Sequence, residues 1–124
     1  MTKVRGIRGA TTADNNTRDS ILDATSEMLA RLTEANGLAV DDIAAAYFTT
    51  TRDLNAEFPA LAARKMMGWE YVALLDSHEM RVPDALTQCI RVLILVNTDK
   101  APQELANVYL KGATNLRDRG IKEA

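Results

Sequence analysis

The segment Cys89–Asn97 constrains the fold more strongly than any other part of the chain. Successive side chains of a β-strand point to opposite faces, so the residues of this segment divide into two sets. One face carries Cys89, Arg91, Leu93 and Leu95, and the other carries Ile90, Val92, Ile94 and Val96. Both faces are apolar apart from Arg91, which predicts a central strand of a sheet rather than an edge strand.

The other elements follow from hydrophobic spacing and from residues that begin or end helices. Apolar residues recur at helical spacing from Ile21 to Leu32, and Gly37 supplies the stop. Pro59 suits the start of a second helix and Gly68 its end. The predicted order is a strand over 4–10, the first helix, a helical turn over 40–43, a strand over 45–50, the second helix, strands over 69–75 and 89–97, a short helix from Pro102 and a strand over 108–110.

This order predicts an α+β fold, in which a mixed β-sheet carries the two main helices on one face. The other face of such a sheet needs a cover of its own, which self-association would provide. With 124 residues the chain is large enough for one core, so we expect a single domain over residues 1–124. Residues 113–124 lack periodicity and carry mixed charge, and we expect them to form a mobile tail.

Composition narrows the class of protein. The formal net charge of −2 argues against general affinity for nucleic acid, which usually accompanies a basic patch. The single cysteine excludes an internal disulfide and fits a reducing compartment. No signal peptide is recognisable, and the longest apolar run, Val92–Val96, is too short to span a bilayer. We therefore expect a cytoplasmic protein that binds neither nucleic acid nor membranes.

Two arginines, Arg8 and Arg91, lie inside apolar strand-like segments with no acidic residue beside them in the same strand. A guanidinium stays charged, so its burial demands an anionic or strongly polar partner. For one arginine alone, pairing with a distant carboxylate or extension past a strand end is the ordinary explanation. Two such arginines favour a site for a carboxylate or phosphate anion, which guanidinium groups bind through two parallel hydrogen bonds.

The segment Asp76–Met80 follows an apolar strand and is predicted to be a loop lining a cleft. Asp76 and Glu79 could pair with the arginines or accept hydrogen bonds from hydroxyl groups of a ligand. His78 is interpreted as a solvated loop residue rather than a general base. With one histidine and one cysteine in the chain, we expect no metal site.

Two further groups are given structural interpretations. The spacing of Gly6 and Gly9 does not form a dinucleotide-binding fingerprint, and close backbone packing explains them better. Cys89 is expected to be an inert thiol of the core. From the residues alone, the sequence therefore predicts an anion-binding α+β domain.

Five sequence blocks, in order along the chain, resemble the monofunctional, AroH-type chorismate mutases over roughly residues 3–118. They are Val4–Thr12, Asp53–Ala60, Gly68–Tyr71, Cys89–Val92 and Val108–Leu110. The resemblance implies a homotrimer arranged as a pseudo-α/β barrel, with active sites between subunits. It also implies a cofactor-free isomerase that rearranges chorismate to prephenate in the biosynthesis of phenylalanine and tyrosine.

The resemblance also implies roles for individual residues. Arg8, Glu79, Arg91 and Tyr109 would line the site from one subunit, with Arg8, Glu79 and Arg91 as the catalytic groups. Substrate-binding residues of the neighbouring subunit would be Phe58, Ala60 and Arg64, and Leu116 and Arg117 would belong to a tail segment that closes over the ligand. Asp76 would accept a hydrogen bond from the ring hydroxyl.

The chain departs from some relatives at two positions: Asp76 stands where they have cysteine, and Leu61 where they have lysine. We expect activity to survive both departures, because neither changes Arg8, Arg91 or Glu79. The alternative hypothesis is a non-catalytic trimeric module that binds a small carboxylate. Deamination of reactive imines by a trimer of similar architecture fits the blocks less well.

Overall fold

The computed structural model describes residues 1–116 of the chain. Five strands form one sheet in the order β3-β2-β4-β1-β5. The elements are β1 (Lys3–Thr12), α1 (Arg18–Asn36), β2 (Ile43–Thr50), α2 (Ala60–Met66), β3 (Ala73–His78), β4 (Cys89–Thr98) and β5 (Val108–Tyr109), with 3-10 turns at Val40–Asp42, Pro102–Glu104 and Lys111–Ala113. No helix of this part of the chain is long and apolar enough to cross a membrane.

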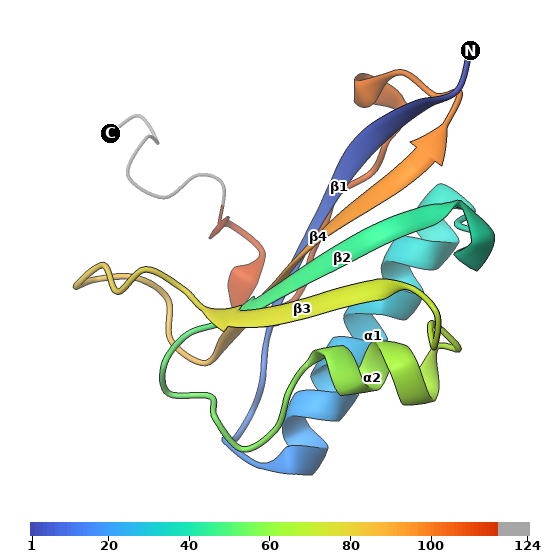
Figure 1. The fold of residues 1–124 in the computed structure, drawn as a ribbon. Helices are drawn as coiled ribbons and strands as arrows, with labels where there is room; N and C mark the ends of the chain where they lie inside the picture. Colours follow the sequence, from blue (N-terminus) through green and yellow to red (C-terminus); the bar gives the residue numbers. More distant parts are fainter. Residues whose placement is uncertain (117–124) are drawn as a thin grey trace, which may run out of the picture.

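The predicted architecture is confirmed. β4 is the middle strand and pairs antiparallel with β1 and β2, while β3 and β5 add parallel strands at the two edges. Both helices lie on the same face of this mixed sheet (Figure 1). The sequence predicted the central position of β4, because both faces of this strand are apolar apart from Arg91. Edge strands rarely have two apolar faces.

The core lies between the sheet and the helices. Thr17 caps the start of α1, with its hydroxyl accepting a hydrogen bond from the backbone N–H of Ser20, and Gly37 in the left-handed conformation caps its end. Its apolar stripe packs against the inner face of the sheet through fully buried side chains, among them Ile21, Met28, Leu29 and Leu32 from the helix and Ile7, Phe48, Ile90 and Ile94 from the strands.

Close packing explains Gly9, as predicted. A Cβ atom at this position would lie 2.6 Å from Cδ1 of Leu32 and 3.3 Å from Cγ1 of Val92, so only glycine lets α1 approach β1 here. At Gly6 an added Cβ would meet only an ordinary contact, 3.4 Å from Cδ1 of Leu93. Close packing therefore accounts for Gly9 but not for Gly6.

The other face of the sheet is left open by residues 1–116, and large apolar side chains are exposed on it. The Leu75 side chain is 65% exposed, and Tyr47, Leu93 and Leu95 are also exposed. Arg8 and Arg91 stand on this open face, and the Arg91 side chain is 47% exposed. The prediction that both arginines are buried is therefore wrong for the single chain, because the helices cover only the opposite face.

The third strand was predicted too early in the chain. It covers Ala73–His78 rather than residues 69–75, because Gly68 turns the chain at a φ of +75° and sends Trp69 into the core. Residues 69–72 form a turn in which the Val72 N–H donates to the carbonyl of Trp69. Asp76, Ser77 and His78 consequently belong to a strand and not to a loop. Of the predicted tail, Ala113 is buried, and 117–124 lie outside the described residues.

Candidate active site

The register of the sheet explains how the site is assembled on the open face. Residues that pair across neighbouring strands share a face, so each row of partners across the sheet forms a line of adjacent side chains. One row is Tyr109, Ala10, Arg91, Thr49 and Ser77, and the next is Arg8, Leu93, Tyr47 and Leu75. Arg8 and Arg91 therefore lie on neighbouring strands, in adjacent rows of the same face.

A pocket of about 580 Å³ opens over these rows. Among its lining residues are five of the predicted site residues: Arg8, Glu79, Arg91, Tyr109 and Leu116. They come from β1, the segment after β3, β4, β5 and the C-terminal end of the described chain. The structure thus brings together residues that are far apart in the sequence, from Arg8 to Leu116.

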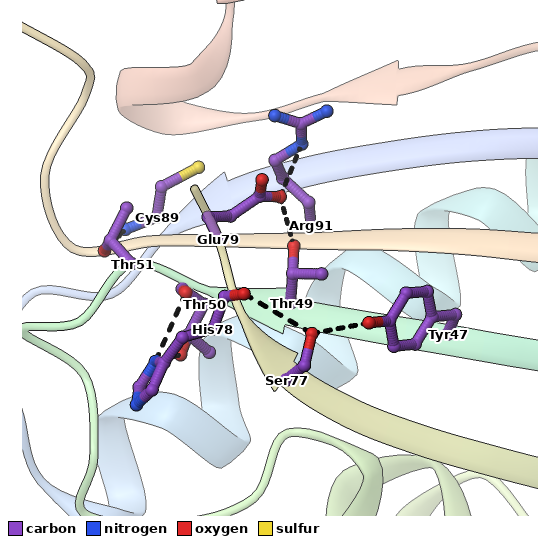
Figure 2. Close-up of polar contacts among 9 residues, drawn as sticks. All are labelled: Tyr47, Thr49, Thr50, Thr51, Ser77, His78, Glu79, Cys89 and Arg91. Atoms are coloured by element: carbon purple, nitrogen blue, oxygen red, sulfur yellow. Dashed lines mark hydrogen bonds and ion pairs between the residues drawn. The ribbon is translucent and has the colours of Figure 1, made fainter. Parts of the chain in front are cut away.

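Glu79 and Arg91, which both line this pocket, form an ion pair (Figure 2). Nε of Arg91 lies 3.3 Å from Oε2 of Glu79, and the hydroxyl of Thr49 donates a hydrogen bond to the same oxygen. Because Arg91 is held through Nε, its two terminal nitrogens are directed away from the carboxylate (Figure 2). Of the two roles that the sequence left open for Glu79, the structure shows the pairing with an arginine, and the terminal nitrogens of Arg91 remain as donors for an anion.

Tyr109 and Arg8 also face the pocket with unused hydrogen-bonding capacity. The Tyr109 hydroxyl is buried and has no hydrogen-bond partner among the described residues. Such a group costs free energy unless a ligand or water supplies the missing partner. The backbone N–H of Arg8 donates to Oδ1 of Asn107, whereas its guanidinium makes no ion pair within residues 1–116. The side chains of Arg8, Arg91 and Tyr109 therefore line the same pocket.

The remaining predicted site residues lie elsewhere. Phe58 and Asp76 line a second pocket of about 300 Å³, between the loop before α2 and the helix side of β3. Phe58 is 67% exposed, Ala60 is buried at the start of α2, and Arg64 is exposed on that helix. Arg117 lies outside the described residues.

Asp76 does not pair with Arg8 or Arg91 within the chain, so that alternative for Asp76 is wrong. On β3 it is the partner of Phe48, whose side chain is fully buried on the helix side, and it therefore faces away from the open side. Oδ1 of Asp76 instead accepts a hydrogen bond from the backbone N–H of Ala60 at 3.0 Å. The residue ties the first turn of α2 to the sheet.

Burial sets the protonation behaviour of two side chains. It raises the pKa of Asp76 above the ordinary value, and the Ala60 N–H and the charge of Arg64 offset that effect only partly. Burial also raises the pKa of the Cys89 thiol to about 11. Cys89 lines the pocket but stays a thiol at neutral pH, which fits its predicted inertness. Within residues 1–116 no group of three or more metal-ligating side chains gathers.

Among residues 1–116, Thr49 makes the one further side-chain hydrogen bond to the Glu79–Arg91 pair, and the sequence did not predict it. The available signal was weak: Ala45, Tyr47 and Thr49 lie at alternate positions of the predicted strand and so share one of its faces. That Thr49 stands directly opposite Arg91 depends on the register between β2 and β4, which no local pattern encodes. His78, by contrast, is exposed as expected, with Nδ1 3.2 Å from the Thr50 hydroxyl oxygen.

The fold and pocket define a class: a half-covered α+β sheet whose open face carries a pocket lined by two arginines, a glutamate and a tyrosine. Comparison with known proteins makes the class specific. The family profile of chorismate mutase type I matches residues 4–119, and the chain belongs to this family.

Individual relatives agree with this assignment. The chain is 46% identical to a chorismate mutase AroH of Thermus thermophilus over 92% of its own length and 93% of the relative. It is 40% identical to the chorismate mutase AroH of Bacillus subtilis, over 92% and 90% of the two chains. A solved chorismate mutase from Clostridium thermocellum superposes with a TM-score of 0.85 at 50% identity, covering 88% of this chain and 96% of that one.

The raised pKa of Asp76 predicts a pH-dependent effect of replacing it. A carboxyl group whose folded-state pKa lies above its unfolded value stabilises the fold only at low pH, and this contribution is lost as the pH rises through the folded pKa. Asp76→Asn keeps an oxygen for the Ala60 N–H and cannot ionise. We expect the variant to gain stability relative to wild type as the pH rises from about 4 to about 7.

Urea unfolding midpoints across this pH range, at one fixed protein concentration, measure the effect. Glu27→Gln, at an exposed carboxylate on α1, serves as the control and should show no such trend. A difference between Asp76→Asn and wild type that stays constant with pH would contradict the assigned protonation behaviour.

Proposed function

We propose that this chain is a chorismate mutase, which rearranges chorismate to prephenate for the biosynthesis of phenylalanine and tyrosine, and that residues 1–124 form one catalytic domain. The observation that carries the proposal is the convergence of Arg8, Arg91, Glu79 and Tyr109 on one pocket. Membership of the type I family and the names of the relatives support it. The single cysteine fits a cytoplasmic location.

The chemistry of the reaction suits a site of this kind. Chorismate carries two carboxylates and rearranges within one molecule: the ether C–O bond breaks while a C–C bond forms, with no proton transfer and no nucleophile. The enzyme must therefore hold a compact conformer and stabilise the negative charge that develops on the ether oxygen. Fixed cations supply both effects, and no cofactor has a step to perform.

Each residue of the pocket has a role in this proposal. The free terminal nitrogens of Arg91 contact the ether oxygen and a carboxylate, since a guanidinium can bridge two acceptors. Arg8 and the unpartnered hydroxyl of Tyr109 hold carboxylate. Glu79 accepts a hydrogen bond from the ring hydroxyl and orients Arg91. Leu116, the last of the described residues, lines the pocket and supplies an apolar contact to the ligand.

The proposal includes a homotrimer with active sites between subunits. The open apolar face, with Leu75, Leu93 and Leu95 exposed, supports such an assembly, because monomers rarely leave such a surface in water. The pocket over Arg91 and the second pocket beside Phe58 share no lining residue. A head-to-tail ring brings the first pocket of each subunit against the second pocket of its neighbour, so Phe58, Ala60, Arg64 and Asp76 act on the neighbour's substrate.

Conversion of chorismate tests the function directly. Incubation with chorismate, followed by NMR, should show prephenate forming far faster than in buffer. Arg91→Lys keeps a charge but loses the planar fork, so kcat should fall on the order of a hundred-fold or more. Arg5→Lys is the matched control: Arg5 is on β1 outside the pocket, with Nε 3.4 Å from the carbonyl of Lys100, and its replacement should leave the rate unchanged.

A folded protein that binds chorismate without converting it would overturn the proposal in favour of the non-catalytic binding module. Near-normal turnover by Arg91→Lys would refute the role given to Arg91.

Subunit mixing tests the shared site. Arg91→Ala and Arg64→Ala should each be strongly impaired, because each removes one side of every site. When the two variants are unfolded, mixed in equal amounts and refolded, on the order of a quarter of the sites regain both arginines if these come from different subunits. Steady-state rates before and after mixing measure this recovery. No recovery beyond that of each variant refolded alone would contradict a shared site.

A further inference from the structure

Thr49 is a pocket residue to which no role has been given so far. It is half-buried on β2 and lines the pocket beside Glu79 and Arg91. In the sheet it stands opposite Arg91 of β4 on one side and opposite Ser77 of β3 on the other. The two strand pairings fix the backbone of Thr49, and its side chain projects on the open face.

The Thr49 hydroxyl and the Arg91 guanidinium meet at a single atom. The hydroxyl donates a hydrogen bond to Oε2 of Glu79, and the guanidinium forms an ion pair with the same oxygen, with Nε 3.3 Å away (Figure 2). The other carboxylate oxygen, Oε1, has no interaction with a described residue. One oxygen of Glu79 is thus used for anchoring, and the other remains for a ligand.

Without Thr49, little would fix the Glu79 carboxylate. Glu79 follows the last residue of β3, and its backbone N–H donates to the carbonyl of Thr50 at 2.8 Å. That bond holds the main chain but leaves three rotatable side-chain bonds free. The contact with Arg91 is a part-exposed ion pair, and such pairs contribute little by themselves because water screens them.

We propose that Thr49 is a positioning residue: its hydroxyl fixes the Glu79 carboxylate, which in turn holds the Arg91 guanidinium in the orientation that the rearrangement needs. The inference rests on the function proposed above and adds a residue to it. Thr49 acts through Glu79 and not on the substrate. A small misplacement of a catalytic group is costly in rate, since catalysis depends on donors that are already in place when charge develops.

Two substitutions separate this role from an ordinary structural one. Thr49→Val keeps the size and the β-branch that suit a strand but removes the hydroxyl, whereas Thr49→Ser keeps the hydroxyl and removes the methyl group. Thr11→Val is the matched control, because the Thr11 hydroxyl is buried on β1 and has no hydrogen-bond partner among the described residues.

Steady-state kinetics of the full chain with chorismate gives the readout. We expect Thr49→Val to lower kcat by about ten- to a hundred-fold while KM changes by less than about three-fold, since the loss falls on the transition state. Thr49→Ser should stay within about three-fold of wild type, and Thr11→Val should match wild type. In a Glu79→Ala background, Thr49→Val should have almost no further effect, because the two residues act in series.

Three results would overturn the role of Thr49 while leaving the proposed function intact: an unchanged kcat for Thr49→Val, equal losses for the Val and Ser variants, or a rise in KM alone. A folded wild-type protein that does not convert chorismate would overturn the proposed function, and the role of Thr49 with it. Circular dichroism of each variant confirms that the fold is retained.

Discussion

The charge on Arg91 cannot be removed by deprotonation, and its position in the middle strand determines how the rest of the chain is arranged. Arg91 belongs to β4, the one strand with two antiparallel neighbours, so its side chain projects from the centre of the sheet. A helix packed over this face would have to bury a permanent charge, which is costly without a closely matched partner. α1 and α2 both cover the opposite face, and the Arg91 face stays open.

The open face acquires its chemistry through the pairing of strands. Neither Arg8 nor Arg91 has a carboxylate on its own strand, and the acidic partner, Glu79, comes from the segment after an edge strand. Thr49 of the intervening strand reaches the same carboxylate. In the proposed trimer this face is closed by another copy of the chain, so the exposure of Arg91 in one chain and its enclosure in the assembly are compatible. In this trimer the apolar residues around the pocket contact the neighbouring subunit, and the charged residues inside the pocket bind the substrate.

Local signals were sufficient for most of the fold. The alternation of Cys89–Asn97 predicted the central strand, and the stripe from Ile21 to Leu32 with Gly37 predicted the first helix. Local signals failed at β3, where the segment beginning at Trp69 resembles a strand, although Trp69 fills the core at the start of a turn. The residues alone predicted an anion site at Arg8 and Arg91 and offered Glu79 as a candidate partner, whereas the full set of site residues came through resemblance. Nothing local indicates that Glu79 meets Arg91 in particular or that Asp76 faces the helices. Both facts depend on the register between strands distant in sequence.

Preorganisation is the central claim: Glu79 orients Arg91 before the substrate binds, and the substrate then contacts the terminal nitrogens of Arg91. Crystal structures of the free protein and of its complex with prephenate test this claim most directly. The account predicts that Nε of Arg91 contacts Glu79 in both, and that ligand oxygens bind the terminal nitrogens of Arg91 in a pocket closed by a neighbouring copy. A free protein in which Arg91 is turned away from Glu79, or a ligand bound outside this pocket, would contradict it.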